Sequence, residues 1–292
     1  MRIGARGSDL AQYQARWVAE ILSRDGIDSE QVIIETHGDR FLDKPLDQLG
    51  VQGVFTKEIE DALASEEIDL AVHSFKDIAT QQPPGLKIVA ITRREDPAEL
   101  LLVRKEVLDS NGSRVPLSTG AVVGTSAVRR ERQLLAWRPD LEVRSLRGNV
   151  PTRLEKLAQG DYDAIYLAAA GVQRLGLDLT RFEVVRFDPT SFIPCPGQGA
   201  LAVEMREHDP LAARVRELLN HPETEHATAI ERQLLTHFGG GCSLPLGAYT
   251  EPAGADWHLA GFWGGAGGPI WDAVTGPETE LVAKLHDRLT GN

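Results

Sequence analysis

Short apolar runs alternate with amphipathic stretches through the first two thirds of this 292-residue chain. Runs such as LKIVAI (86–91) have the length and continuous apolar character of buried strands, and apolar positions recur between them at helical spacing. The first helical face is marked by Leu10, Gln14, Trp17, Val18, Ile21 and Leu22. Strands are predicted at 2–5, 31–36, 68–74, 86–91, 99–104, 121–124, 141–146, 164–168 and 201–205. Further helices are predicted at 55–64, at 126–137, from about 151, and in a short segment after 168, which favours two doubly wound α/β domains.

The chain is predicted to cross between these two domains twice. The first crossover is expected at 92–99 and the second at 189–200, after which strand 201–205 returns to the first domain. Two crossovers indicate a hinge, so the arrangement resembles that of periplasmic binding proteins.

The pattern changes from His221 onward, which predicts a small third domain of α+β type. One helix runs to Leu235, short strands follow, and a last helix begins at about Glu278. The predicted bounds are 1–95 with 199–217 for the first domain, 96–198 for the second, and 218–292 for the third.

Composition is that of an ordinary globular protein, with 42% hydrophobic and 25% charged residues. No apolar run approaches the roughly 20 residues of a membrane helix, and the first residues read as a strand rather than an export signal. The two cysteines, Cys195 and Cys242, could form one bridge, but so few argue for a reducing compartment. We therefore expect a cytoplasmic protein with no membrane partner.

The net charge of −12 hides a local basic segment. Residues 121–160 hold eight Lys or Arg and four Asp or Glu, a balance of +4, so the remainder of the chain is at −16. A small basic site in an acidic protein concentrates small anions, whereas nucleic acid requires a broad basic face. Nucleic-acid binding is therefore not expected.

Arginines gather at three turns where a predicted strand leads into a helix: GARGS (4–8), GTSAVRR (124–130) and RGNVPTR (147–153). A helix start is already positive, so an exposed cation there costs about 0.3–1 kcal/mol unless an anion is bound. Any one of them alone is better explained as a solvated surface charge, but their recurrence predicts an anion site. Carboxylates fit best, because guanidinium pairs with them bidentately and no phosphate loop is present. The side chains concerned are Arg6, Arg129, Arg130, Arg147 and Arg153, with Ser8, Thr125 and Ser126 expected to cap the helices or bind the same ligand.

Two further residues are candidates for chemistry. Asp77 in HSFKD follows a predicted strand, where an ionised carboxylate among cations can stabilise a developing cation and relay protons. Cys242 in FGGGCSLPLG follows three glycines, which let the backbone approach another surface and leave the sulfur uncovered. The plainer explanations are a strand-to-loop turn for Asp77 and a small residue in a tight turn for Cys242.

The segment LDQLGVQGVF (46–55) is either a lid over the same edge or an ordinary surface loop. The eight histidines include no i, i+4 pair and the chain has no C-x-x-C, so no metal site is expected.

These residues together resemble the hydroxymethylbilane synthase family, whose members are also called porphobilinogen deaminases. The match runs over essentially the whole chain, and the order of the motifs makes coincidence implausible. The matching segments are RxS (6–8), GVFTKEIE (53–60), AVHSFKD (71–77), REDPAE (94–99), VGTSAVRRERQL (123–134), RPDLEVRSLRGNVPTRL (138–154), YDAIYLAAAGVQRLG (162–176), PGQGALAVE (196–204) and GGCSLPLG (240–247).

The resemblance implies a transferase that condenses four porphobilinogens head to tail into the linear tetrapyrrole hydroxymethylbilane, with release of ammonia. It implies a dipyrromethane cofactor joined to Cys242 by a thioether, and Asp77 as the catalytic carboxylate that stabilises the azafulvenium formed as ammonia leaves. The implied cofactor-binding residues are Cys242, Lys76, Asp77, Thr125, Ser126, Arg129, Arg130, Arg147 and Gly148. The implied substrate-binding residues are Arg6, Ser8, Gln14, Arg147, Arg153, Arg174 and Gln198. The family also suggests a monomer.

Several positions depart from the family pattern. Gln48 and Gln52 stand where lysines are usual, His37 where arginine or lysine is common, and Ala127 where serine is usual; Leu244 is slightly off pattern. Fewer lid cations should weaken the attraction for carboxylates. Two alternatives therefore stay open: a divergent, weakly active or non-catalytic relative that binds a polycarboxylate, and an anion-binding protein of the solute-receptor kind, in which Cys242 would have no purpose.

Overall fold

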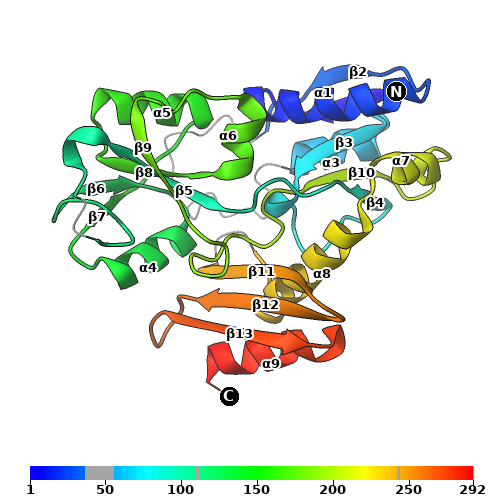
Figure 1. The fold of residues 1–292 in the computed structure, drawn as a ribbon. Helices are drawn as coiled ribbons and strands as arrows, with labels where there is room; N and C mark the ends of the chain where they lie inside the picture. Colours follow the sequence, from blue (N-terminus) through cyan, green and yellow to red (C-terminus); the bar gives the residue numbers. More distant parts are fainter. Residues whose placement is uncertain (37–55, 110–111, 242–243, 292) are drawn as a thin grey trace.

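The computed structural model describes residues 1–36, 56–109, 112–241 and 244–291. Their strands form two sheets of five strands and one of three (Figure 1). This confirms the predicted class of two α/β units followed by a smaller α+β unit. The hinge between the first two units stays a prediction.

The first sheet combines strands from two distant parts of the chain. Its unit comprises β1 (Arg2–Ala5), α1 (Asp9–Arg24), β2 (Glu30–Ile33), α3 (Lys57–Ala64), β3 (Leu70–Ser74), η2 (Phe75–Asp77), β4 (Leu86–Ile91), β10 (Leu201–Arg206) and α7 (Ala212–Leu219). The strand order is β2-β1-β3-β10-β4, with β1 parallel to β2 and β3, and β10 antiparallel between β3 and β4. Apolar side chains of α1 and α7 pack on one face and those of α3 on the other, so both faces are removed from water.

The second sheet lies entirely within one stretch of chain. Its unit comprises β5 (Glu99–Arg104), η3 (Lys105–Val107), β6 (Val122–Gly124), α4 (Val128–Trp137), β7 (Glu142–Arg144), α5 (Val150–Gln159), β8 (Ala164–Ala168), α6 (Ala169–Leu175) and β9 (Phe182–Arg186). The order is β7-β6-β8-β5-β9, with β6 parallel to β7 and β8, and β5 antiparallel to β8 and β9. Helix α4 packs on one face, and α5 and α6 pack on the other.

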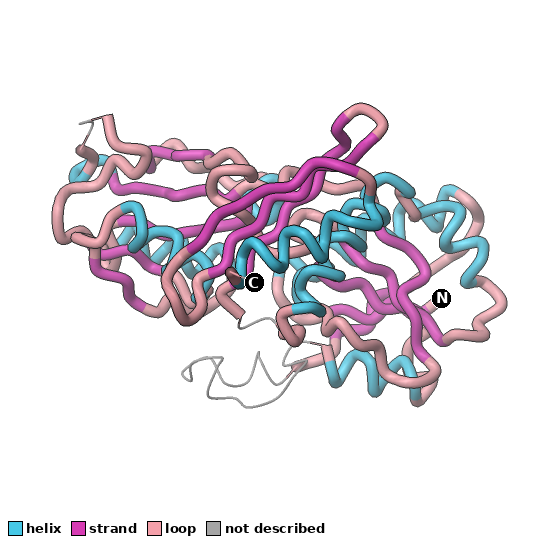
Figure 2. The backbone as a smooth tube through the Cα atoms, turned by 90° about the horizontal axis from the view of Figure 1, so that it is seen from below, coloured by secondary structure: helices cyan, strands magenta, loops and turns pink. Residues whose placement is uncertain are grey.

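The third unit is an antiparallel sheet with two helices on one face. It comprises α8 (Pro222–His237), β11 (Leu246–Ala253), β12 (Asp256–Trp263), β13 (Ile270–Gly276) and α9 (Glu278–Thr290). The opposite face places Ala260 and Phe262 against Ile193 of the second crossover. Figure 2 shows the strands of this sheet lying across the two larger units.

The sequence predicted most elements, with some differences. The bounds of β4, β5 and β8 and the start of α9 are confirmed. Strand β9 and helix α7 were not predicted, and α4 begins at Val128 rather than at Ser126. The chain leaves the first sheet after β4 and returns at β10, which confirms two passages between the sheets; the exact domain bounds stay a prediction.

Candidate active site

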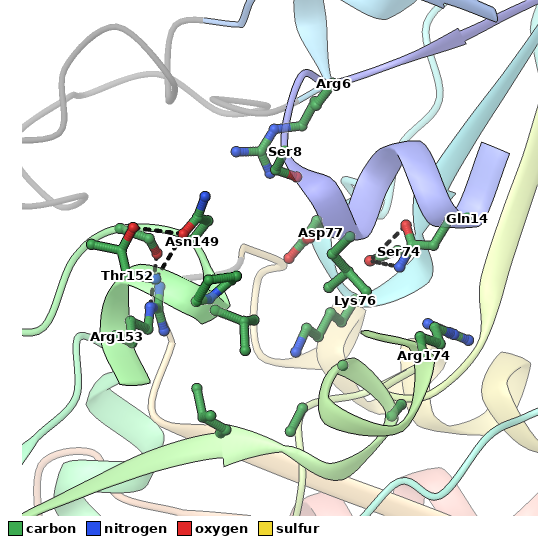
Figure 3. Close-up of a pocket in the computed structure, with 18 of the residues that line it drawn as sticks. Arg6, Ser8, Gln14, Ser74, Lys76, Asp77, Asn149, Thr152, Arg153 and Arg174 are labelled. Atoms are coloured by element: carbon green, nitrogen blue, oxygen red, sulfur yellow. Dashed lines mark hydrogen bonds between the residues drawn. The ribbon is translucent and has the colours of Figure 1, made fainter. Parts of the chain in front are cut away.

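A cleft of about 630 Å³ is lined by residues from both large units, at the carboxyl ends of their parallel strands. Figure 3 shows side chains from the turn after β1, the end of β3, the start of α5 and the end of α6 around the same space. The charged side chains in its wall are the cations Arg6, Lys76, Arg130, Arg147, Arg153 and Arg174 and the carboxylates Glu35 and Asp77. α/β sheets bind ligands at this edge, and among the residues that the structure describes six cations against two carboxylates favour an anion.

Helices α1 and α5 begin at the cleft, and a side chain caps the first turn of each. Ser8 caps α1, where its Oγ accepts a hydrogen bond from the Ala11 N–H at 3.3 Å. Asn149 caps α5, where its Oδ1 accepts from the N–H and the hydroxyl of Thr152 at 2.9 and 2.6 Å (Figure 3). Pro151 lies in the first turn of α5, as predicted.

Helix α4 begins differently from the prediction. Its N-cap residue is Ala127, which has no side-chain acceptor, so the helix lacks a side-chain cap. Thr125 and Ser126 precede the cap: Thr125 Oγ1 accepts from the Ala127 N–H at 3.2 Å, and Ser126 donates to the Leu146 carbonyl at 2.8 Å. The serine usual in the resembled family would supply the cap that Ala127 omits.

The first-turn arginines of α4 have an anion within the protein. Glu99, fully buried at the start of β5, accepts from Arg129 at 2.5 Å and from Arg130 at 2.6 Å. Burial alone would raise the pKa of Glu99, but the charges of Arg130 and Arg129 outweigh it and hold that pKa at about 2. Arg129 also donates to the Ile193 carbonyl at 2.7 Å. The anion that these misplaced cations require is therefore at least partly the Glu99 carboxylate.

Two other guanidiniums in the cleft donate to backbone carbonyls. Arg153 donates to Gly148 at 2.8 Å and Arg174 donates to Gly199 at 2.6 Å, and within the described residues neither forms an ion pair. Burial lowers the pKa of both to about 10, and neighbouring guanidiniums contribute for Arg153. By contrast, carboxylate partners raise the pKa of Arg214 on the surface. The cleft thus holds desolvated positive charge that a bound carboxylate would stabilise.

Asp77 and Lys76 share the short turn η2 at the end of β3. Burial lowers the pKa of Lys76, whose Nζ donates to Gln198 Oε1 at 3.1 Å. Arg232 of α8 holds this turn from the third unit by donating to the Ile78 carbonyl at 3.0 Å, with its guanidinium 4.5 Å from the centre of the Phe75 ring. The turn that carries Asp77 is therefore fixed by contacts with both neighbouring units.

The structure brings most of the predicted site residues together. The lining includes Arg6, Ser8, Gln14, Lys76, Asp77, Ser126, Arg130, Arg147, Gly148, Arg153, Arg174 and Gln198. It does not include Thr125 or Arg129. Cys242, His37, Gln48, Gln52 and the predicted lid at 46–55 lie outside the described residues.

The glycines before Cys242 can be placed. Gly239, Gly240 and Gly241 all have positive φ, a conformation that other residues rarely adopt. A Cβ added at Gly240 would lie 2.7 Å from the Thr80 hydroxyl. The glycine turn therefore passes against a residue three positions after Asp77.

Sequence reasoning missed several polar residues of the site. Asn149 and Thr152 line the cleft, and the run N-V-P-T (149–152) at a helix start was the available signal. Glu35 also lines it, directly before the undescribed segment. The indication of the role of Glu99 was weaker: it is an acidic residue at the start of a strand that is otherwise mostly apolar and buried.

The described part of the chain offers neither a metal-binding cluster nor a membrane-spanning helix. No group of three or more His, Cys, Asp or Glu side chains there could hold a metal ion. Among the same residues, no helix is both long and apolar enough to cross a bilayer.

Comparison with known sequences gives one consistent result. The family model described as "Porphobilinogen deaminase, dipyromethane cofactor binding domain" matches residues 1–214. A porphobilinogen deaminase of Geobacter sulfurreducens is 44% identical over 285 residues, covering 96% of this chain and 87% of the relative. That of Pelobacter propionicus is 44% identical over 296 residues, covering 99% and 93%. Among solved structures, a periplasmic substrate-binding protein of an ABC transporter from Coxiella burnetii has a TM-score of 0.45 at 16% identity, covering 80% of this chain and 96% of that one.

Proposed function

Since this chain belongs to the porphobilinogen deaminase family, we propose that it condenses four porphobilinogen molecules into hydroxymethylbilane with release of ammonia. The observation that carries the proposal is the surplus of cations among the described lining residues of the cleft: six cations face two carboxylates, and one of the six, Arg130, is already paired with Glu99 behind the wall. Porphobilinogen bears an acetate and a propionate group, so a growing chain of such rings adds two carboxylates per unit. Guanidinium binds carboxylate bidentately and in a buried cleft does so strongly.

The same wall fits a dipyrromethane cofactor. Two such rings carry four carboxylates, and the described lining offers the cations Arg6, Lys76, Arg147, Arg153 and Arg174 besides Arg130, which is already paired with Glu99. The cleft volume of about 630 Å³ lies within the usual range for ligand pockets. We propose that Cys242 forms the thioether; support comes from Gly240, two residues earlier, which lies against Thr80 near Asp77. When bound, the cofactor supplies the pyrrole carbon on which the chain starts. The residues that would hold it are Lys76, Asp77, Ser126, Arg130, Arg147 and Gly148. Thr125 and Arg129 do not line the cleft and would act from behind the lining residues.

Asp77 is the proposed catalytic carboxylate. When ammonia leaves the aminomethyl group of porphobilinogen, positive charge develops on the ring and its N–H becomes a stronger donor. A carboxylate fixed beside the ring accepts that hydrogen bond and stabilises the cation, because it is already oriented and partly shielded from water. Arg6, Ser8, Gln14, Arg147, Arg153, Arg174 and Gln198 are the proposed substrate-binding residues.

Each predicted domain has its own proposed role. We propose that residues 1–95 with 199–217 carry the catalytic carboxylate, 96–198 most of the arginines, and 218–292 the attachment cysteine. Hinge motion between the first two would let the cleft accommodate a lengthening chain. We further propose that the protein acts as a monomer in the cytoplasm, in tetrapyrrole biosynthesis.

Ammonia release from porphobilinogen tests this function. The parent should release one ammonia per porphobilinogen consumed and form a linear tetrapyrrole. Asp77→Asn should lower kcat by about 10²–10³-fold, since it removes the charge that stabilises the cation. Asp61→Asn is the control, because Asp61 is an exposed carboxylate of α3 paired with Lys57. A parent protein that binds porphobilinogen without releasing ammonia would instead be a non-catalytic relative.

A further inference from the structure

A second cavity, of about 110 Å³, opens beside Asp77. It shares Asp77, Lys76 and Ser74 with the main cleft and continues to His73 on β3 and Ile59 on α3. This volume is enough for several water molecules. The cavity therefore connects the proposed catalytic carboxylate with a buried imidazole.

The His73 imidazole is held by a carboxylate within the sheet. His73 and Glu204 lie diagonally across the antiparallel strands β3 and β10, and His73 Nε2 is 3.2 Å from Glu204 Oε2. The two residues are 5% and 0% exposed. The other oxygen, Glu204 Oε1, is buried with no hydrogen-bond partner among the described residues. An incompletely bonded buried carboxylate is costly, and a positive charge on the adjoining imidazole would offset that cost.

The surrounding charges favour movement of a proton toward the sheet. Glu60 of α3 lies near His73 and Glu204, and burial together with the charge of Glu204 raises the pKa of Glu60. On the cavity side, Arg6 and Lys76 stand with Asp77. Cations at the cleft repel a proton and the carboxylates behind His73 attract it.

We propose that His73, oriented by Glu204, accepts the proton that Asp77 collects at each condensation. The proposal rests on the function proposed above. When two porphobilinogen units join, the aminomethyl group of one is in its ammonium form, its C–N bond breaks, and ammonia leaves with the electron pair. Its methylene carbon bonds to the α-carbon of the other ring, which loses a proton while the C–H electron pair returns to that ring. Asp77 takes the proton, water in the cavity passes it to neutral His73, and Asp77 is ionised again for the next unit. His73 then returns the proton through the same water to the released ammonia, which departs as ammonium, so that His73 is neutral for the next condensation.

His73→Gln tests this proton route. In the holoenzyme, kcat should fall at least tenfold with KM within about twofold, because proton acceptance and not substrate binding is affected. The pH dependence of kcat should differ between the parent and His73→Gln, because only the parent has a titratable group at this position. Asp69→Asn is the matched control: it breaks a partly buried ion pair with Arg2 in the same unit without facing the cavity. Parent-like kcat and pH dependence for His73→Gln, or an equal loss in Asp69→Asn, would overturn the proposal.

A second measurement does not depend on turnover. The His73 imidazole should titrate at lower pH in Asp77→Asn than in the parent when followed by NMR, because the two groups are linked through the cavity. An unchanged titration would contradict the link even in an inactive protein. If the parent released no ammonia while the titrations were coupled, the proposed reaction would fail and the link would stand.

Discussion

Arg94 and Glu231 join the first crossover to helix α8 through a bidentate ion pair of 2.7 and 3.1 Å. Glu231 is fully buried and also accepts from the backbone N–H groups of Gly197 at 2.7 Å and Thr250 at 2.9 Å. Arg94 in turn donates to the Gln198 carbonyl at 2.8 Å. One carboxylate thus ties both crossovers to the third unit.

Glu231→Ala should destabilise the protein by about 3–5 kcal/mol, because it leaves the Arg94 guanidinium and two buried N–H groups without their acceptor. Thermal unfolding of the purified variant measures this. The matched control on the same helix is Glu225→Ala, which removes a half-exposed partner of Arg216 and should cost less than about 1 kcal/mol. Equal losses in the two variants would show that Glu231 has no special structural role.

Glu99→Gln should lose stability at neutral pH, by about 3 kcal/mol, since two buried guanidiniums lose their counter-charge. The folded pKa of Glu99 is about 2, below the value of the unfolded chain. Its stabilisation is therefore complete above about pH 4.5 and disappears as pH falls toward 2. The difference in free energy of unfolding between parent and variant should shrink over that window.

The control for this pH dependence is Glu142→Gln. Glu142 pairs with Arg144 on the surface, so its replacement should change stability little at any pH. A parent-minus-variant difference for Glu99→Gln that stays constant from pH 6 to 2 would contradict the assigned role of the buried carboxylate.

Arg153→Met should stabilise the cofactor-free protein by about 1 kcal/mol while weakening carboxylate binding. Burial and neighbouring guanidiniums lower the pKa of Arg153 to about 10, which means that its charge is unfavourable in the folded protein without a ligand. The stability of the variants should be compared by thermal unfolding of proteins that also carry Cys242→Ser and therefore lack the cofactor. Arg144→Met, at an exposed arginine, is the control. A loss of stability in that background would show that the guanidinium is satisfied without any ligand.

The sequence predicted the arginine cleft well because its signals are local. Arg6, Arg130, Arg147 and Arg153 lie in or just before a first helical turn, and parallel strands place such turns at one edge of a sheet. Arg174 lies in the last turn of α6 and was placed by the family resemblance alone. Strand β9 was missed because only Phe182 is buried in it, so an edge strand of this kind lacks the apolar pattern of a core strand.

Pairings across the fold could not be predicted from the sequence. Glu99 lies about thirty residues before the arginines that it binds, and His73 lies 131 residues before Glu204. Such contacts depend on strand order, in particular on the insertion of β10 beside β3. The caps at α4 were mispredicted for a local reason, because the helix starts two residues later than its polar residues indicate.

The intact mass of the purified protein tests the central claim most directly. If a cofactor of two pyrrole rings is attached through sulfur, the parent should be heavier than its sequence by two condensed porphobilinogen units. Cys242→Ser should have the mass of its sequence alone, while Asp77→Ala should keep much of the excess yet lose turnover. A parent at the bare sequence mass, or a Cys242→Ser variant with the same excess, would contradict the account.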